Sequence, residues 1–214
     1  EVLFRHAAIL FDFFRGLDTD AHGCSMVRRE TGRINDGAGF AKLGRPEWHT
    51  CQFGTDGVAM TILLLGKDGQ VGWQLQRSLA PHGPVIACGR AECDLSDLEQ
   101  IRSVVREIRP SVIVNATAYT AVDKAESEPE LAHRINTQAP GTLAEEAARQ
   151  GALLVHYSTD YVYDGAKTSP YLETDPTAPQ SIYGQSKLAG EEAIRAVDGH
   201  SLIFRTSWVF GARG

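Results

Sequence analysis

The sequence predicts an α/β protein with a doubly wound parallel sheet. From residue 60 onward, short apolar runs alternate with longer segments of helical periodicity. Continuous apolar runs of this kind are typical of strands that are buried on both faces of a parallel sheet. A glycine-rich turn at residues 66–72 follows the first run and opens the first helical segment. Repeated strand–helix–strand units favour a parallel sheet with helices on both faces.

The expected elements follow one another in a regular order. Strands are expected at residues 61–65, 85–88, 111–115, 153–158 and 201–205. Helices are expected at residues 70–80, from residue 96 to the residue before Pro110, at residues 131–150, and around Tyr183 and Lys187.

Particular residues mark the helix ends. Residues 96–99 read SDLE, a capping box in which the Ser96 and Glu99 side chains would satisfy free backbone N–H groups. Pro140 should kink or restart the segment 131–150, because proline has no backbone N–H. Gly151 suits the C-terminal cap of that segment.

Met60 marks the change from an irregular to a regular sequence. Residues 1–59 hold scattered glycines and charges without helical or strand periodicity. We expect residues 60–214 to form one domain, and residues 1–59 to be a poorly ordered extension unrelated to it. The alternative is a real accessory segment. Limited proteolysis distinguishes the two, because an extension would be cut near Met60 and leave a stable core.

Composition excludes several classes of function. The 214 residues carry a formal charge of −6 and contain no run of Lys and Arg, which argues against nucleic-acid binding. The apolar stretch 2–14 is too short and too charged to span a membrane. Cys24, Cys51, Cys88 and Cys93 lack metal-ligand spacing, and the chain suggests a reducing, cytoplasmic setting without a metal site.

The turn at residues 66–72 has the spacing GxxGxxG between a strand and a helix. Glycines there allow a tight turn and let backbone N–H groups approach a pyrophosphate at the positive end of the helix. This context is typical of Rossmann-type dinucleotide-binding domains. We therefore take Gly66, Gly69 and Gly72 as candidate cofactor-binding residues.

The end of the second strand suggests which dinucleotide binds. NAD sites often have an acidic residue there, whereas this chain has Arg90, which could pair with a 2′-phosphate. We therefore expect NADPH to be preferred, with NADH left open. The alternative is an ordinary surface arginine. Asp94 and Leu95 could border the adenine, although Asp94 could instead cap a turn.

Tyr183 and Lys187 lie four residues apart on an expected helix and therefore share one face. Thr159, at the end of a preceding strand, can meet them. Such a group can protonate a carbonyl oxygen while a hydride reaches its carbon, and the Lys187 charge would lower the pKa of Tyr183. By itself the Tyr-x-x-x-Lys spacing is also common on surface helices. Nearby, His156 is interpreted as a packed core residue rather than a ligand.

Several segments resemble the extended short-chain dehydrogenase/reductase family, over residue 60 to the end of the chain. They are residues 62–73, 109–116, 120–126, 156–163, 183–191 and 204–209. Within the family the resemblance is greatest to reductases of 4-keto sugars attached to dTDP. It implies NADPH-dependent reduction of dTDP-4-dehydro-L-rhamnose to dTDP-L-rhamnose in nucleotide-sugar and lipopolysaccharide biosynthesis.

The resemblance also implies roles for individual residues. Tyr183 would donate the proton, Lys187 would tune it and anchor the ribose, and Thr159 would contact the carbonyl. The pyrophosphate would face Gly69, Gln70 and Val71, and the rest of the cofactor would contact Ala118, Tyr119 and Tyr157. The sugar would contact Thr120, Val122, Asp160 and Trp208. Members are often Mg²⁺-dependent homodimers, but the resemblance assigns no metal ligand here.

The chain departs from the family pattern at its C-terminus. It ends at Gly214, before the lobe that completes the nucleotide-sugar pocket in the family. We therefore expect NADPH binding but little or no turnover by this polypeptide.

Two other functions stay open at this stage. One is a nucleotide-sugar epimerase or dehydratase on the same fold, although dehydratases of this group carry an Asp-Glu pair where this chain has Asp160 and Tyr161. The other is a non-catalytic dinucleotide-binding subunit, such as the regulatory subunits of methionine adenosyltransferase. Intact Thr159, Tyr183 and Lys187 disfavour that reading.

Overall fold

The computed structural model describes residues 60–211, so the expected extension at residues 1–59 lies outside the described residues. A single parallel sheet runs through this part in the order β2-β1-β3-β4-β5. Its strands are β1 (Ile62–Leu65), β2 (Val85–Cys88), β3 (Val112–Asn115), β4 (Leu153–Thr159) and β5 (His200–Thr206). The strands expected from the apolar runs are therefore all confirmed.

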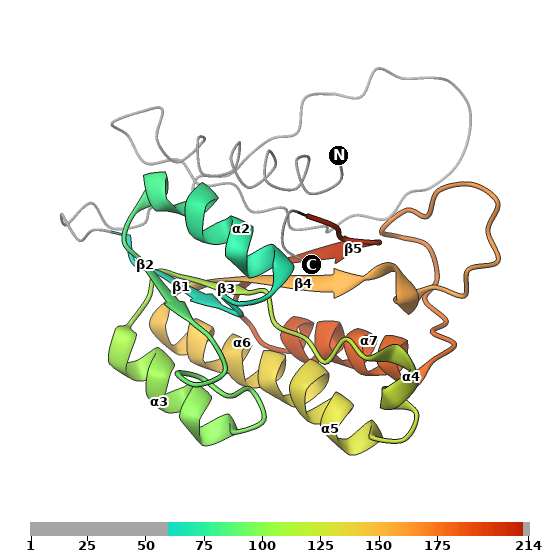
Figure 1. Ribbon diagram of the computed structural model, residues 1–214, viewed down its shortest axis with the longest axis horizontal. Coiled ribbons are helices and arrows are strands. Elements are labelled where there is room, and N and C mark those ends of the chain that lie inside the picture. The colour runs from blue at the N-terminus through green and yellow to red at the C-terminus, as the bar shows by residue number, and fades with distance from the viewer. Residues whose placement is uncertain (1–59, 212–214) are drawn as a thin grey trace. The chain divides into compact units, whose positions relative to one another are not determined.

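Helices cover both faces of the sheet (Figure 1). One face carries α2 (Gln70–Leu79), and the other carries α3 (Leu98–Ile108), α6 (Ala139–Gln150) and α7 (Ile182–Arg195). Because β2 and β3 flank β1 on opposite sides, the direction of winding reverses there. The doubly wound prediction is confirmed, and the reversal leaves a crevice for a ligand at the carboxyl ends of β1 and β3.

Shorter helical segments complete the description. They are η1 (Ala80–His82), α4 (Val122–Ala125), α5 (Pro129–His133), η2 (Arg134–Gln138) and η3 (Asp160–Val162).

The start of α3 corrects one prediction. Asp97, not Ser96, caps this helix, and its side chain accepts the backbone N–H groups of Glu99 and Gln100. Ser96 instead donates through both its backbone N–H and its hydroxyl to Asp94 Oδ1, at 2.9 and 2.8 Å. The capping-box reading was wrong because this second acidic side chain holds Ser96 in the preceding loop.

The expected break at Pro140 is confirmed as a π-helical turn, η2, between α5 and α6. Proline cannot donate to the carbonyl four residues earlier, which belongs to Asn136. Gly190 of α7 packs against that carbonyl, where a Cβ would approach its oxygen to 2.0 Å. The break therefore creates the place where α7 docks. At the other end of α6, Gly151 caps the helix with a φ of 67°, as expected.

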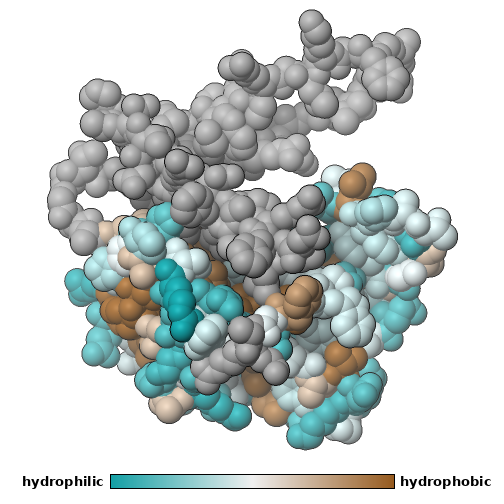
Figure 2. Space-filling view, turned by 45° about the horizontal axis from the view of Figure 1, so that its top comes forward, coloured by the Kyte–Doolittle hydropathy of each residue, from teal (hydrophilic) through white to brown (hydrophobic). Residues whose placement is uncertain are grey.

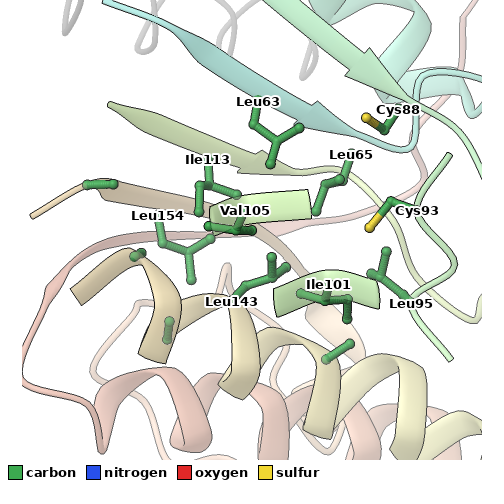
Figure 3. Close-up of a cluster of buried hydrophobic side chains, with 14 of the residues drawn as sticks. Leu63, Leu65, Cys88, Cys93, Leu95, Ile101, Val105, Ile113, Leu143 and Leu154 are labelled. Atoms are coloured by element: carbon green, nitrogen blue, oxygen red, sulfur yellow. The ribbon is translucent and has the colours of Figure 1, made fainter. Parts of the chain in front are cut away.

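A hydrophobic core joins the sheet to α3 and α6. Figure 3 shows Leu63, Ile113 and Leu154 of the strands pointing toward Val105 and Leu143 of the helices. These side chains are essentially fully buried. Burial of each such side chain contributes roughly 1.5–3 kcal/mol. The strand ends that carry the site therefore rest on a closely packed platform.

The surface is mixed in character. On the face shown in Figure 2, hydrophilic residues predominate among the coloured atoms, with hydrophobic residues in scattered patches. Along residues 60–211, no helix has both the length and the apolar character needed to cross a membrane.

Candidate active site

A cavity of about 740 Å³ opens at the carboxyl ends of the strands. All predicted site residues except Gly72 and Tyr119 line it. Those that line it are Gly66, Gly69, Gln70, Val71, Arg90, Asp94, Leu95, Ala118, Thr120, Val122, Tyr157, Thr159, Asp160, Tyr183, Lys187 and Trp208. Volumes of this size are common among cofactor and substrate sites.

The glycine turn gives the cavity an anion-binding corner. Gly66 has a φ of 89°, and a Cβ there would lie 2.7 Å from Thr117 Cγ2. Gly69 caps α2 without any side-chain hydrogen bond, so the first N–H groups of the helix are not satisfied by a cap. A Cβ at Gly69 would meet only the Gly66 carbonyl, at 3.5 Å. The space beside this helix end therefore suits a pyrophosphate group.

Gly72 has a different position from the one predicted. It does not line the cavity, and a Cβ there would approach the Gly66 carbonyl oxygen to 2.0 Å. Its missing side chain lets α2 pack directly against the turn. Gly72 therefore supports the shape of the glycine turn without lining the cavity.

Charged groups gather after β2, where the prediction placed the 2′-phosphate. The Arg90 side chain is 81% exposed, and its Nε lies 3.3 Å from Asp94 Oδ2. Glu92 accepts hydrogen bonds from the Gly89 backbone N–H, at 2.8 Å, and from Lys67 Nζ, at 2.5 Å. Asp94 also caps its turn, and the hydrogen bonds from Ser96 hold the pKa of Asp94 below its usual range. Arg90 is thus placed at the cavity rim with its guanidinium accessible.

Tyr183, Thr159 and Lys187 converge on the same cavity from α7 and β4. Tyr183 and Thr159 are 9% and 5% exposed, and Lys187 is 1% exposed. The Tyr161 ring meets the Tyr183 ring edge-on, with centroids 5.6 Å apart. Ser181 caps α7 by accepting the Gly184 N–H, which fixes the first turn of the helix that carries the tyrosine.

The pKa of Tyr183 differs from the expected direction. Burial raises it, and a hydrogen bond with Thr159 opposes that rise only in part. Burial has the opposite effect on Lys187 and lowers its pKa to about 8, although the charge of Glu191 raises it in part. A lysine that readily loses its charge exerts less pull on a neighbouring phenol. The phenol therefore stays protonated at neutral pH.

Two residues of β4 hold the Lys187 side chain. Its Nζ donates to the Tyr157 carbonyl oxygen at 2.7 Å and lies 3.2 Å from His156 Nε2. His156 is fully buried and contacts Asn115 through Nδ1, so its interpretation as a packed core residue is confirmed.

Tyr119 also departs from the prediction, because its side chain turns away from the cavity. Its hydroxyl donates to Glu128 Oε2 at 2.8 Å. Its backbone N–H and carbonyl are held by Asn136, at 2.8 and 3.1 Å, and Asn136 also donates to Ser186 Oγ at 3.0 Å. Asn136 thus links the loop after β3 to α7. Sequence reasoning missed it, although its place four residues before Pro140 was a signal.

The proposed sugar end of the cavity is organised by Asp160. Its Oδ2 accepts a 2.6 Å hydrogen bond from Ser207 Oγ, which ties the loop after β4 to the loop after β5. Trp208 follows with a φ of 46° and 84% exposure, so its indole ring is available at the rim. No group of three His, Cys, Asp or Glu side chains in the described residues could hold a metal ion. The expectation of Mg²⁺ therefore has no support from this part of the chain.

The doubly wound sheet, the glycine turn and the Thr–Tyr–Lys group define an oxidoreductase-type fold of the short-chain dehydrogenase/reductase class. Residues 60–214 match the family described as RmlD substrate binding domain. The chain belongs to this family.

Curated relatives share much of the sequence. A dTDP-4-dehydrorhamnose reductase of Burkholderia thailandensis is 54% identical over 155 residues, which is 72% of this chain and 52% of the relative. The enzyme of the same name from Escherichia coli is 53% identical, over 72% of this chain and 53% of the relative. The chain thus spans about half the length of the curated relatives it matches.

A solved structure supports the same family. The dTDP-4-dehydrorhamnose reductase of Bacillus anthracis, in complex with NADP, is 37% identical with a TM-score of 0.71. The match covers 73% of this chain and 56% of that one.

Proposed function

We propose that the protein is an NADPH-dependent reductase that converts dTDP-4-dehydro-L-rhamnose to dTDP-L-rhamnose in the cytoplasm. The observation that carries this proposal is the convergence of Thr159, Tyr183 and Lys187 on the cavity into which the glycine turn opens. The names of the relatives support the substrate, and the NADP complex of the Bacillus anthracis enzyme supports the cofactor.

The dinucleotide fits the residues that are present. The uncapped N–H groups at the start of α2 would hold the pyrophosphate, beside Gly69, Gln70 and Val71. Arg90 would meet the 2′-phosphate, and Lys187 would meet the ribose next to the nicotinamide. Bound NADPH supplies the hydride for the reaction.

The side chains of this chain supply the proton. Tyr183 keeps its proton at neutral pH, because burial raises the pKa of its phenol. It can therefore donate that proton to the sugar's 4-keto oxygen as the carbonyl becomes an alcohol. Thr159 lines the same cavity and would orient the same oxygen. Positioned proton transfer of this kind contributes roughly 10²–10⁴ in rate.

The environment of Tyr183 favours reduction over dehydration. Tyr161, the residue after Asp160, turns an aromatic ring toward Tyr183 where elimination chemistry would need a carboxylate. Asp160 is present at this end, but position 161 lacks the carboxylate that would complete the acidic pair of a dehydratase.

The experiment is a reductase assay with two readouts. NADPH binding is measured on the 214-residue chain, and turnover of dTDP-4-dehydro-L-rhamnose on a longer product extended to the length of the matched relatives. We expect binding in both, NADPH oxidation with formation of dTDP-L-rhamnose in the longer product, and little turnover in the shorter chain. Tyr183→Phe should keep NADPH affinity and lose turnover. Unchanged turnover in that variant, or no turnover by an NADPH-binding longer product, would refute the proposal.

A further inference from the structure

A buried line of hydrogen bonds runs behind the cavity from Asn115 through His156 to Lys187. Asn115 and His156 have no exposed surface, and Lys187 is 1% exposed. Asn115 Nδ2 lies 3.1 Å from His156 Nδ1, and His156 Nε2 lies 3.2 Å from Lys187 Nζ. The three residues come from β3, β4 and α7, so the line joins three elements of the site.

The loop after β3 fixes which end of the Asn115 amide faces the histidine. Thr117 donates both its backbone N–H, at 3.1 Å, and its hydroxyl to Asn115 Oδ1. A reversed amide would place its NH₂ group against the Thr117 N–H, two donors facing each other. Asn115 Nδ2 is therefore the group that faces His156, and it can only donate.

This orientation dictates where the imidazole carries its hydrogen. His156 Nδ1 must accept from Asn115, so a neutral imidazole has its hydrogen on Nε2. Full burial is the largest cause that lowers the pKa of His156 well below its ordinary value, so the ring is neutral. The Nε2–H group then points at Lys187 Nζ.

The consequence falls on Lys187. A neutral amine has a lone pair that can accept from Nε2–H while one of its own N–H groups donates to the Tyr157 carbonyl oxygen. An ammonium has no lone pair and would oppose Nε2–H with another donor. We infer that His156, oriented by Asn115, is a positioning residue that sets the protonation state of Lys187.

Other charged groups near Lys187 do not reproduce this effect. Glu191, one turn further along α7, raises the pKa of Lys187, but Arg205 of β5 and Arg195 already pair with that carboxylate. Tyr183, on the same helix, stays neutral because burial raises its pKa, and the same holds for the Tyr157 phenol. The hydrogen on His156 Nε2 is thus the donor that favours an uncharged lysine.

For the proposed reductase, this arrangement means that Lys187 exchanges a proton near neutral pH instead of holding a permanent charge. That consequence rests on the proposed function. The arrangement itself does not, because it is a property of the free protein. It can therefore be tested without substrate or cofactor.

The first test is direct measurement of the tautomer in the unmodified 214-residue chain. Long-range ¹H–¹⁵N spectra of histidine-labelled protein distinguish a hydrogen on Nδ1 from one on Nε2. We expect His156 to show the Nε2–H form throughout the pH range in which the protein stays folded. The Nδ1–H form would overturn the inference, whatever the reductase assay shows.

The second test reverses the tautomer. In Asn115→Asp the carboxylate accepts from Nδ1–H, and in Asn115→Leu the donor to Nδ1 disappears without a new charge. Both variants free Nε2 to accept from an ammonium, so the pKa of Lys187, followed through its ¹³Cε signal, should rise by about one unit or more. Lys187→Met assigns the signal.

The matched control is Asn136→Asp, which adds a buried carboxylate beside Ser186, the residue before Lys187 in α7. It should leave the His156 tautomer unchanged, whereas Asn115→Asp should switch it. A pKa of Lys187 that neither Asn115 variant raises would refute the positioning role. The tautomer measurement keeps the inference testable if a variant fails to fold.

Discussion

Glu191 of α7 accepts two hydrogen bonds from the Arg205 guanidinium of β5, at 2.9 and 2.7 Å, although Glu191 has no exposed surface. Ser158 of β4 donates to the same carboxylate at 2.6 Å. Arg205 also donates to the Tyr163 hydroxyl at 2.6 Å. These contacts hold α7 against β4 and β5, so the position of the Tyr183 phenol depends on a charge that lies outside the cavity.

Replacing Glu191 by Ala should destabilise the protein by about 3–5 kcal/mol, because Arg205 would lose the partner that compensates its burial. Urea unfolding at neutral pH measures the loss. Glu192→Ala removes an exposed carboxylate from the same helix and serves as the control, with an expected change below about 0.5 kcal/mol. Equal losses in the two variants would contradict this account.

The same pair predicts an acid-dependent loss of stability. Burial raises the pKa of Glu191, but hydrogen bonds from Arg205 and Ser158 outweigh it and hold the pKa below its ordinary value. A carboxyl group with a depressed pKa stabilises the folded state above its unfolded pKa, and this stabilisation is lost as the pH falls through the folded value. Glu191→Ala should therefore flatten the acid side of the stability curve measured by urea unfolding.

Two glycines of the turn should respond differently to a methyl group. Gly72→Ala places Cβ 2.0 Å from a backbone oxygen, so the turn must shift, at a cost of about 1–3 kcal/mol. Gly69→Ala meets only an ordinary contact and keeps a φ of −75°, so stability should change by about 1 kcal/mol or less. The Gly69 methyl group would still occupy the pyrophosphate corner. We expect NADPH affinity to fall at least about tenfold in Gly69→Ala without a matching fall in the unfolding midpoint.

Arg90→Ala should weaken NADPH binding and leave NADH binding nearly unchanged, because only NADPH carries a 2′-phosphate. The expected loss is about tenfold, in line with roughly 1.5–3 kcal/mol for a hydrogen bond to a charged group, reduced by the exposure of this side chain. Titration of intrinsic fluorescence with each dinucleotide measures both affinities. Arg77→Ala, which removes an arginine stacked on Trp73 outside the cavity lining, is the control. Equal losses for NADPH and NADH would remove Arg90 from cofactor selection.

The sequence was sufficient for the sheet because its strands are buried on both faces. Residues 85–88 form β2 as expected, and the other strands differ from the expected bounds by one residue or less at each end. Strands buried on both faces read as continuous apolar runs, so the runs mark the strands directly. The glycine turn and the Tyr183–Lys187 spacing could also be predicted from the sequence, because each depends on residues close together in the chain.

The missed features depend on residues far apart in the sequence. Asn136 acts on Tyr119 and on Ser186, 17 and 50 residues away. The protonation of Lys187 depends on burial and on His156, 31 residues earlier, neither of which a Tyr-x-x-x-Lys spacing reveals. The start of α3 was misplaced because Ser96 and Asp97 can both cap a helix, and only the fold shows that Asp94 holds Ser96 in the preceding loop.

The buried lysine predicts a distinctive alkaline response. The pKa of Lys187 falls from its ordinary value of 10.5 to about 8, chiefly because burial disfavours the ammonium. Between these two values the unfolded chain binds a proton that the folded protein does not, so stability should rise as the pH increases from 8 to 10.5. The rise amounts to about 3 kcal/mol, at 1.36 kcal/mol per pKa unit. Lys187→Met lacks this titration, so the difference in unfolding free energy between parent and variant should shift by that amount in favour of the parent. Urea unfolding of both proteins at several pH values measures it, and a difference that stays constant over this range would show that Lys187 titrates normally in the folded protein.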